Sequence, residues 1–267
     1  MHEKIKELLL GNKPCAIGKI GSVELMHFYN TFANNKNWPS GVSLAINAGI
    51  NCKTEGEYLF WMDSFKLGLQ SLDAILAWNN NFAEYEVIRS FCDEDCLITD
   101  GFTDIEPFDH GENGWHYGLA DKRVLVISSF KDSIEAQIPN FSKIWNGAKL
   151  GSCEVIRCPQ PFQITGEQPS WFIGNYEKLT DQIFSKDFDI VIVGAGGYSL
   201  PICAYIKAIG KSAIHLGGAT QVLFGIRGSR FDRNFADKEW YGTEHFIRPL
   251  ESDVPKYKHL VEESCYW

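Results

Sequence analysis

The chain has 267 residues, 45% of them hydrophobic, which is enough to bury a large core. Its net charge is −9, and an acidic surface repels phosphate backbones, so we expect no nucleic acid among its partners. The leucine run near the N-terminus is too short for a secretion signal, and no stretch of about eighteen apolar residues occurs. We therefore expect a cytoplasmic protein without a transmembrane segment, and one domain over 1–267, because no linker-like run divides the chain.

Apolar runs alternate with helical patterns along the chain, which predicts an α/β fold: an open, mostly parallel, Rossmann-like sheet with helices on both faces. Strands are predicted at 15–20, 73–78, 96–99, 123–128, 154–157, 189–193 and 212–216. Helices are predicted at 2–10, 22–34, 54–69, 82–91, 133–145, 171–185, 199–209 and 219–226. The polar, glycine-rich segment 100–119 is predicted to be a long loop, of the kind that often forms lids or binding loops.

The eight cysteines are predicted to be reduced. Several of them, such as Cys15 and Cys203, lie inside apolar runs, as buried free thiols do. The two closely spaced cysteine pairs have no second pair at zinc-site spacing nearby, which favours a structural role.

The first candidate site is the strand–helix junction GKIGSVEL at 18–25. Lys19 and Glu24 flank Gly21, and Ser22 is suited to cap the helix. A cation and a carboxylate at such a junction can meet a sugar nucleotide or a metal ion. The alternative is that Glu24 only stabilises the positive end of the helix dipole.

A second junction, GAGGYS at 194–199, follows an apolar strand. Glycines let the backbone bend tightly, and the N-terminus of the following helix suits a phosphate. The dinucleotide fingerprint is incomplete, because Ser199 stands where a third glycine is expected and His215 where an acidic residue would bind ribose. We therefore expect neither NAD nor FAD. The alternative is a tight turn that holds no ligand.

A third group of residues follows the strand at 212–216. Gly217 and Gly218 repeat the glycine turn beside the first, and two such turns at the carboxyl edge of a sheet indicate a ligand crevice. Arg227, Arg230 and Arg233 then follow at spacings of three, and arginine suits bidentate recognition of phosphate. The alternative is a solvated basic face.

Three side chains are candidates for acid–base chemistry. Glu24 would act as a general base if an acceptor hydroxyl came within hydrogen-bond reach, and Glu106 in the segment 100–119 is a second, weaker candidate. His215 could be a base, an electrostatic donor or a satisfied core histidine. The acids and histidines of 100–119 could also hold a divalent cation, or form a solvated loop.

Several segments spread over most of the chain carry a family resemblance. They are KIGSVEL, IEP, KRVLVI, SIEAQ, DFDIVIVGAGGYSLP, IHLGGATQVLFGIRGSR and VEESCYW. KIGSVEL resembles the Arg-x-Gly-Asp-x-Glu element of GT-D-type glycosyltransferases. The whole set resembles GT-D-like proteins associated with bacterial capsule and surface-polysaccharide clusters. Departures from the pattern are Ser22 in place of Asp, Lys19 in place of Arg, Ser128 and Ser129 in place of His-Pro, and LGGATQ in place of a His-x-Asp-type element.

The resemblance implies a bacterial cytoplasmic glycosyltransferase, free or on the inner face of the membrane, that works in surface-polysaccharide biosynthesis. Its partners would be a nucleotide-sugar donor and a saccharide or lipid-linked acceptor. The family uses a divalent metal, Mn²⁺ or Mg²⁺, and Ser22 in place of an acid leaves that requirement open. The residues predicted to bind nucleotide or phosphate are Lys19, Gly21, Ser22, Gly194, Gly196, Gly197, Tyr198, Gly217, Gly218, Gln221, Arg227 and Arg230.

Two other classes of function stay open. One is a non-catalytic nucleotide-binding or scaffold protein of the same pathway, which the replacement by Ser22 favours. The other is a Rossmann-type methyltransferase, whose cofactor also binds at glycine turns. The missing acidic residue after the strand at 212–216 argues against this last class. The sequence is compatible with a monomer or an oligomer.

Overall fold

The computed structural model describes residues 1–34, 42–159 and 172–267. Within them, seven parallel strands form one open sheet in the order β3-β2-β1-β7-β6-β4-β5. The strands are β1 (Ala16–Lys19), β2 (Ala74–Leu76), β3 (Leu97–Thr99), β4 (Val124–Ser128), β5 (Cys153–Arg157), β6 (Ile190–Gly194) and β7 (Ser212–His215). The predicted Rossmann-like α/β fold is confirmed, and every predicted strand is present.

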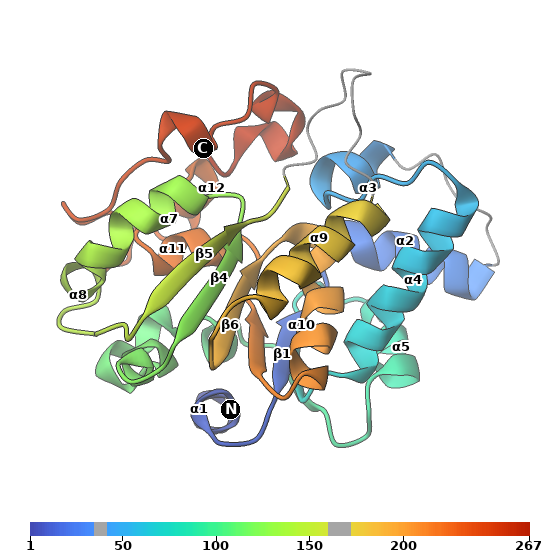
Figure 1. The fold of residues 1–267 in the computed structure, drawn as a ribbon, viewed down its shortest axis with the longest axis horizontal. Coiled ribbons are helices and arrows are strands. Elements are labelled where there is room, and N and C mark those ends of the chain that lie inside the picture. Colours follow the sequence, from blue (N-terminus) through green and yellow to red (C-terminus); the bar gives the residue numbers. More distant parts are fainter. Residues whose placement is uncertain (35–41, 160–171) are drawn as a thin grey trace.

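Helices pack on both faces of the sheet (Figure 1). One face carries α2 (Ser22–Asn34), α3 (Val42–Asn47), α4 (Glu55–Gln70), α5 (Phe82–Phe91), α9 (Phe172–Phe184) and α10 (Ser199–Ala208). The other carries α1 (His2–Leu10), α6 (Phe102–Ile105), α7 (Lys131–Gln137), α8 (Phe141–Ile144), α11 (Ala219–Leu223) and α12 (Ser229–Asn234). Connections that step along the sheet toward β3 use the first face and those that step toward β5 use the second, as crossovers of one hand require.

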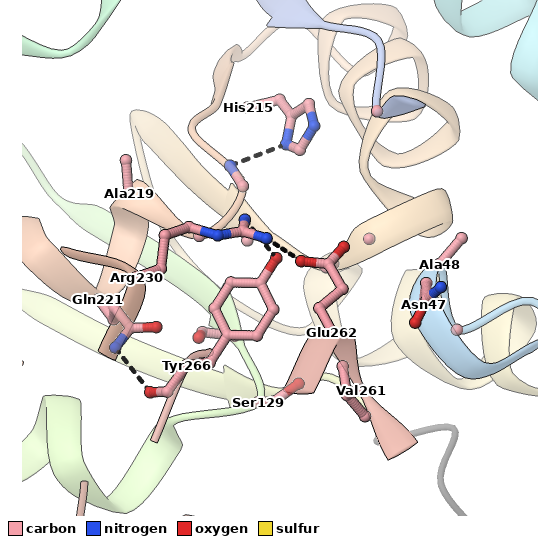
Figure 2. A pocket seen from close by; sticks show the side chains of 18 of the residues that line it. Asn47, Ala48, Ser129, His215, Ala219, Gln221, Arg230, Val261, Glu262 and Tyr266 are labelled. Carbon is pink, nitrogen blue, oxygen red and sulfur yellow. Dashed lines mark hydrogen bonds and ion pairs between the residues drawn. The ribbon is translucent and has the colours of Figure 1, made fainter. Parts of the chain in front are cut away.

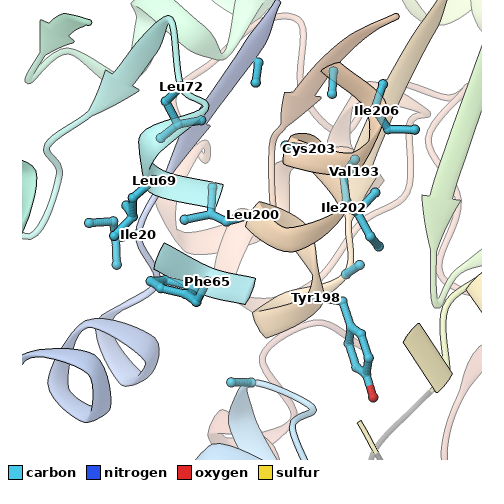
Figure 3. Close-up of a cluster of buried hydrophobic side chains, with 14 of the residues drawn as sticks. Ile20, Phe65, Leu69, Leu72, Val193, Tyr198, Leu200, Ile202, Cys203 and Ile206 are labelled. Atoms are coloured by element: carbon cyan, nitrogen blue, oxygen red, sulfur yellow. The ribbon is translucent and has the colours of Figure 1, made fainter. Parts of the chain in front are cut away.

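The core on the first face is built where α10 crosses α4 (Figure 3). Leu200 and Ile202 of α10 are buried, as are Phe65 and Leu69 of α4. The two helices come close because α4 carries Gly68 at the crossing, where a Cβ would lie 2.7 Å from Leu200. This crossing holds the loop that precedes α10, and with it the glycine turn, at the edge of the sheet.

The segment 100–119 is not the long loop that its composition predicts. It forms α6 and two 3₁₀ helices, Pro107–Asn113 and Trp115–Leu119. Ile105, Phe108, Trp115 and Leu119 are buried against the second face of the sheet. Polar and glycine residues separate these four apolar residues, so the sequence shows no helical or strand periodicity there. The segment packs against the sheet and is not an open lid.

The predicted helix at 133–145 is also interrupted. The structure has α7 and α8 with a 3₁₀ turn, Ile138–Asn140, between them. Pro139 lies in that turn, and proline has no N–H to continue an α-helical hydrogen-bond ladder.

Candidate functional site

A cavity of about 790 Å³ opens at the carboxyl ends of the central strands. The chain leaves β1 and β6 toward one face of the sheet and leaves β7 and β4 toward the other. Neighbouring strands therefore send their loops apart, which is how open α/β sheets form ligand crevices. The residues that line it include Lys19, Gly21, Ser22, Glu24, Ala48, Trp78, Phe102, Glu106, Ser128, Phe130, Gly194, Gly196, His215, Gly217, Gly218, Gln221, Arg230, Arg233, Glu262, Tyr266 and Trp267.

One side of the cavity, here named the N-terminal wall, consists of Lys19, Ser22, Glu24 and Glu106. Lys19 ends β1, and its Nζ lies 2.9 Å from Oε1 of Glu106, which follows α6. The two side chains are only 13% and 11% exposed, so the pair is largely removed from water. The Ser22 hydroxyl donates to Oδ1 of Asn79 at 2.6 Å, a contact that its predicted capping role did not foresee.

Glu24 is a buried carboxyl on the first turn of α2. Burial raises its pKa from 4.5 to about 7, and a hydrogen bond with its own backbone offsets this only in part. Glu24 forms no ion pair with any residue that the structure describes, and no neighbouring charge contributes to the shift of its pKa. A Cβ at Gly21 would overlap the Glu24 carboxylate, so glycine at 21 leaves the space that this buried carboxylate occupies. The result is an acid that changes charge near neutral pH beside an open cavity.

His215 ends β7 and is buried at the back of the cavity. Burial and, secondly, the charge of Lys19 lower its pKa to about 3. Its Nδ1 lies 3.2 Å from the Val193 carbonyl oxygen and from the Gly217 nitrogen. The ring is therefore neutral over the physiological range and would be a poor base there. Of its three sequence interpretations, the satisfied buried histidine has the most support.

The glycines of GAGGYS approach the protein's own chain. A Cβ at Gly196, whose φ is +54°, would lie 2.5 Å from the Ala48 carbonyl oxygen. The Gly197 N–H donates to that same oxygen at 2.7 Å. Tyr198 is buried in the core, where Asn175 donates to its hydroxyl at 3.1 Å. Gly194 and Gly196 reach the cavity, whereas Gly197 and Tyr198 are not among its lining residues.

The opposite side, here named the C-terminal wall, consists of Gln221, Arg230, Glu262 and Tyr266 (Figure 2). Arg230 forms an ion pair with Glu262 through Nη2 and donates from Nη1 to the Tyr266 hydroxyl at 3.0 Å. Its guanidinium also lies over the Tyr266 ring, 4.8 Å from the centroid. Gln221 donates to the Tyr266 carbonyl oxygen at 3.1 Å and fixes the backbone of this segment.

Arg227, Arg230 and Arg233 do not act together as predicted. Arg230 and Arg233 lie one turn apart on α12 and both line the cavity. Arg227 precedes the helix and is not among the lining residues; its Nε donates to Asp232 at 3.0 Å. Within the described part of the chain, Arg233 is exposed and has no carboxylate within 4.0 Å. Arg233 thus takes the place at the cavity that was expected of Arg227.

Sequence reasoning missed the residues after 260. No site residue was predicted in VEESCYW, and its aromatic tail could have packed on this domain or on a partner, yet Glu262, Tyr266 and Trp267 line the cavity. Gly218 allows the Tyr266 ring to pack closely, since a Cβ at 218 would lie 2.8 Å from that ring. A glutamate close to two aromatic residues was the available signal, but nothing local indicated where this segment packs.

The protein ligands for a divalent metal do not converge in this cavity. Among residues 1–34, 42–159 and 172–267, no three His, Cys, Asp or Glu side chains are placed to hold an ion. Glu106 is engaged by Lys19, and Glu262 by Arg230. The side chains at this cavity therefore assign no role to a bound metal ion.

The comparisons with known proteins add no assignment: the chain matches no protein-family model, no curated protein and no solved structure.

All eight cysteines are free thiols, as predicted. In the described residues, none of the helices has the length and apolarity needed to span a bilayer.

Proposed function

We propose that the protein is a glycosyltransferase that binds a nucleotide-sugar donor in this cavity and transfers its sugar in surface-polysaccharide biosynthesis. The observation that carries the proposal is the position of Glu24. A carboxyl group with a pKa of about 7 lines a ligand-sized cavity at the carboxyl edge of a parallel sheet. A general base works best when its pKa lies near the working pH, and Glu24 meets that condition.

The cavity suits such a donor in size and in charge. Sites for small molecules and cofactors typically have volumes of about 300–1,000 Å³, and this one has about 790 Å³. Arg230 and Arg233 on one side and Lys19 on the other can face the two phosphates of a diphosphate. The aromatic rings of Trp78 and Phe102 at the N-terminal wall offer flat apolar faces to a sugar.

In the proposed transfer, the Glu24 carboxylate accepts the proton of an acceptor hydroxyl. The hydroxyl oxygen forms a bond to the anomeric carbon while the bond from that carbon to the diphosphate oxygen breaks. The nucleoside diphosphate leaves with the electron pair, and Arg230 and Arg233 stabilise its added negative charge. Electrostatic stabilisation of this kind is commonly a large part of such catalysis.

The test is a thermal-shift panel of nucleoside diphosphates and sugar nucleotides, each with and without Mn²⁺ or Mg²⁺. We expect stabilisation by at least one sugar nucleotide and slow donor hydrolysis or transfer that Glu24→Gln abolishes. If no nucleotide of the panel shifts the melting temperature under any metal condition, the proposal is wrong.

A non-catalytic nucleotide-binding protein is the second candidate, and one observation favours it. Lys19 and Arg230 are each already paired with a glutamate, so the charge of the cavity is partly balanced without a ligand. In that case the wild type and Glu24→Gln would bind the nucleotide equally, and neither would turn it over.

A further inference from the structure

Arg230 has its best anion-binding position filled by a side chain of its own protein. Its Nη2 is paired with Glu262 while Nη1 and the face of the guanidinium contact Tyr266 (Figure 2). Guanidinium groups bind carboxylates and phosphates with the same fork of N–H donors. A carboxylate at this position therefore stands where a phosphate oxygen of a ligand would bind.

The Arg230–Glu262 pair is open to exchange in a way that the Lys19–Glu106 pair is not. The side chains of Arg230 and Glu262 are 36% and 30% exposed, about three times as much as those of the other pair. Water and ions can reach a pair of this exposure, which weakens it and lowers the cost of replacing one partner.

The backbone that presents Glu262 is strained. Glu262, Glu263 and Ser264 are consecutive and have φ angles of +41°, +56° and +63°, a region that residues with side chains seldom adopt. Residues held in such conformations are over-represented at ligand-binding and switch segments, and here the strained turn carries the carboxylate that pairs with Nη2 of Arg230.

The residues that follow the turn are firmly attached. The Arg230 N–H donates to the Cys265 carbonyl oxygen at 2.8 Å, and Gln221 holds the next residue, Tyr266. Ser229 donates to the Trp267 carbonyl oxygen at 2.8 Å. A ligand can therefore displace the Glu262 side chain while Tyr266 keeps its place beside Arg230.

We propose that Glu262 acts as an internal competitor for anions: it occupies Arg230 in the free protein, and a phosphate group of the ligand displaces it. The proposal rests on the proposed function for the identity of the ligand as a diphosphate. It adds that affinity for the diphosphate is reduced by Glu262, and that Arg230 is the cation through which this happens.

The probe is inorganic pyrophosphate, with its Kd measured by calorimetry for the full chain. Removing the competing carboxylate with Glu262→Gln should tighten binding about three- to fivefold, the upper part of the range for a partly exposed ion pair. Glu263→Gln is the matched control, because it removes the same charge from the exposed neighbouring residue, and it should change the Kd less than about twofold. In an Arg230→Gln background, Glu262→Gln should give no gain.

Equal tightening in Glu262→Gln and Glu263→Gln would show a general charge effect and overturn the proposal, as would a lack of binding by every variant. Melting temperatures confirm that each variant is folded. A parallel titration of the wild type with every nucleoside diphosphate and sugar nucleotide of the thermal-shift panel separates the two ideas. Nucleotide binding with no difference between the glutamate variants refutes only the competitor, whereas a selective gain for pyrophosphate without nucleotide binding refutes only the proposed function.

Discussion

The two walls of the cavity each contain an ion pair, and the pairs differ in how they are held. Lys19 and Glu106 stand on the end of a central strand and on a packed segment, and both are about nine-tenths buried. Arg230 and Glu262 stand on a short helix and on a strained turn, and about a third of each side chain meets solvent. The Lys19–Glu106 pair is a fixed structural contact. In the Arg230–Glu262 pair, we propose that a ligand can take the place of Glu262.

The same contrast separates Glu24 and Arg233, which line the cavity and form no ion pair with any residue that the structure describes. Glu24 is a buried member of the N-terminal wall, and its pKa is raised because the charged form loses its water. Arg233 stands exposed at the rim beside the C-terminal wall. In the proposed transfer, the N-terminal wall would accept the proton and the C-terminal wall would bind the anion.

The largest effect should come from the N-terminal wall. Glu24→Gln keeps the shape of the side chain and removes the base, so the transfer rate should fall by about 10²- to 10⁴-fold with little change in KM. The rate of the wild type should rise with pH through about 7, as the carboxylate forms. Steady-state kinetics measure both. Glu3→Gln, in the first turn of α1 and exposed, is the control and should have no effect.

Breaking the buried pair should cost more stability than breaking the exposed one. Lys19→Met leaves Glu106 unpaired in a largely dry site and should lower the free energy of unfolding by about 3 kcal/mol. The double variant Lys19→Met/Glu106→Gln should recover a good part of the loss, because no charge is left unpaired. Urea titrations of the three proteins measure this, and a loss no greater in the single than in the double variant would contradict it.

The pH dependence of stability should report on Glu24 itself. Its pKa is about 7 in the folded protein and 4.5 as its ordinary value, so the unfolded chain releases the proton first as pH rises. The wild type should lose stability relative to Glu24→Gln between about pH 4.5 and 7, by at most about 3 kcal/mol, and no further above that range. Denaturation at pH 4.5, 6 and 8 tests the sign. A relative gain by the wild type with rising pH would show that the carboxylate is stabilised as an anion.

The smallest effect is expected at the C-terminal wall. Glu262→Gln should change the free energy of unfolding by less than about 1 kcal/mol, because a partly exposed pair gains little over its hydrated ions. Added salt should reduce the difference further. Thermal melts at low and high ionic strength measure it. A loss as large as that of Lys19→Met would remove the distinction between the two pairs.

The strands, their order of occurrence and the strand–helix junctions could be predicted from the sequence, because their signals are local. An apolar run such as 190–193 has to be buried on both faces, and a glycine directly after it marks a turn. The junction with Lys19 and Glu24 was found in this way, and both residues line the cavity. Where apolar anchors are separated by polar residues, as in 100–119, the same reasoning failed.

Contacts between distant parts of the chain were decided only by the tertiary structure. A side chain at position 196 would clash with the backbone of Ala48, about 150 positions earlier in the chain, so glycine is needed there. The glycine spacing of GAGGYS in the sequence would have been the same for a turn that binds phosphate. Whether Arg227 or Arg233 faces the cavity depends on where α12 begins and on Asp232. Glu262 acquires its position by pairing with Arg230, since a short segment of mixed polar, apolar and aromatic residues carries no local pattern that specifies its partner.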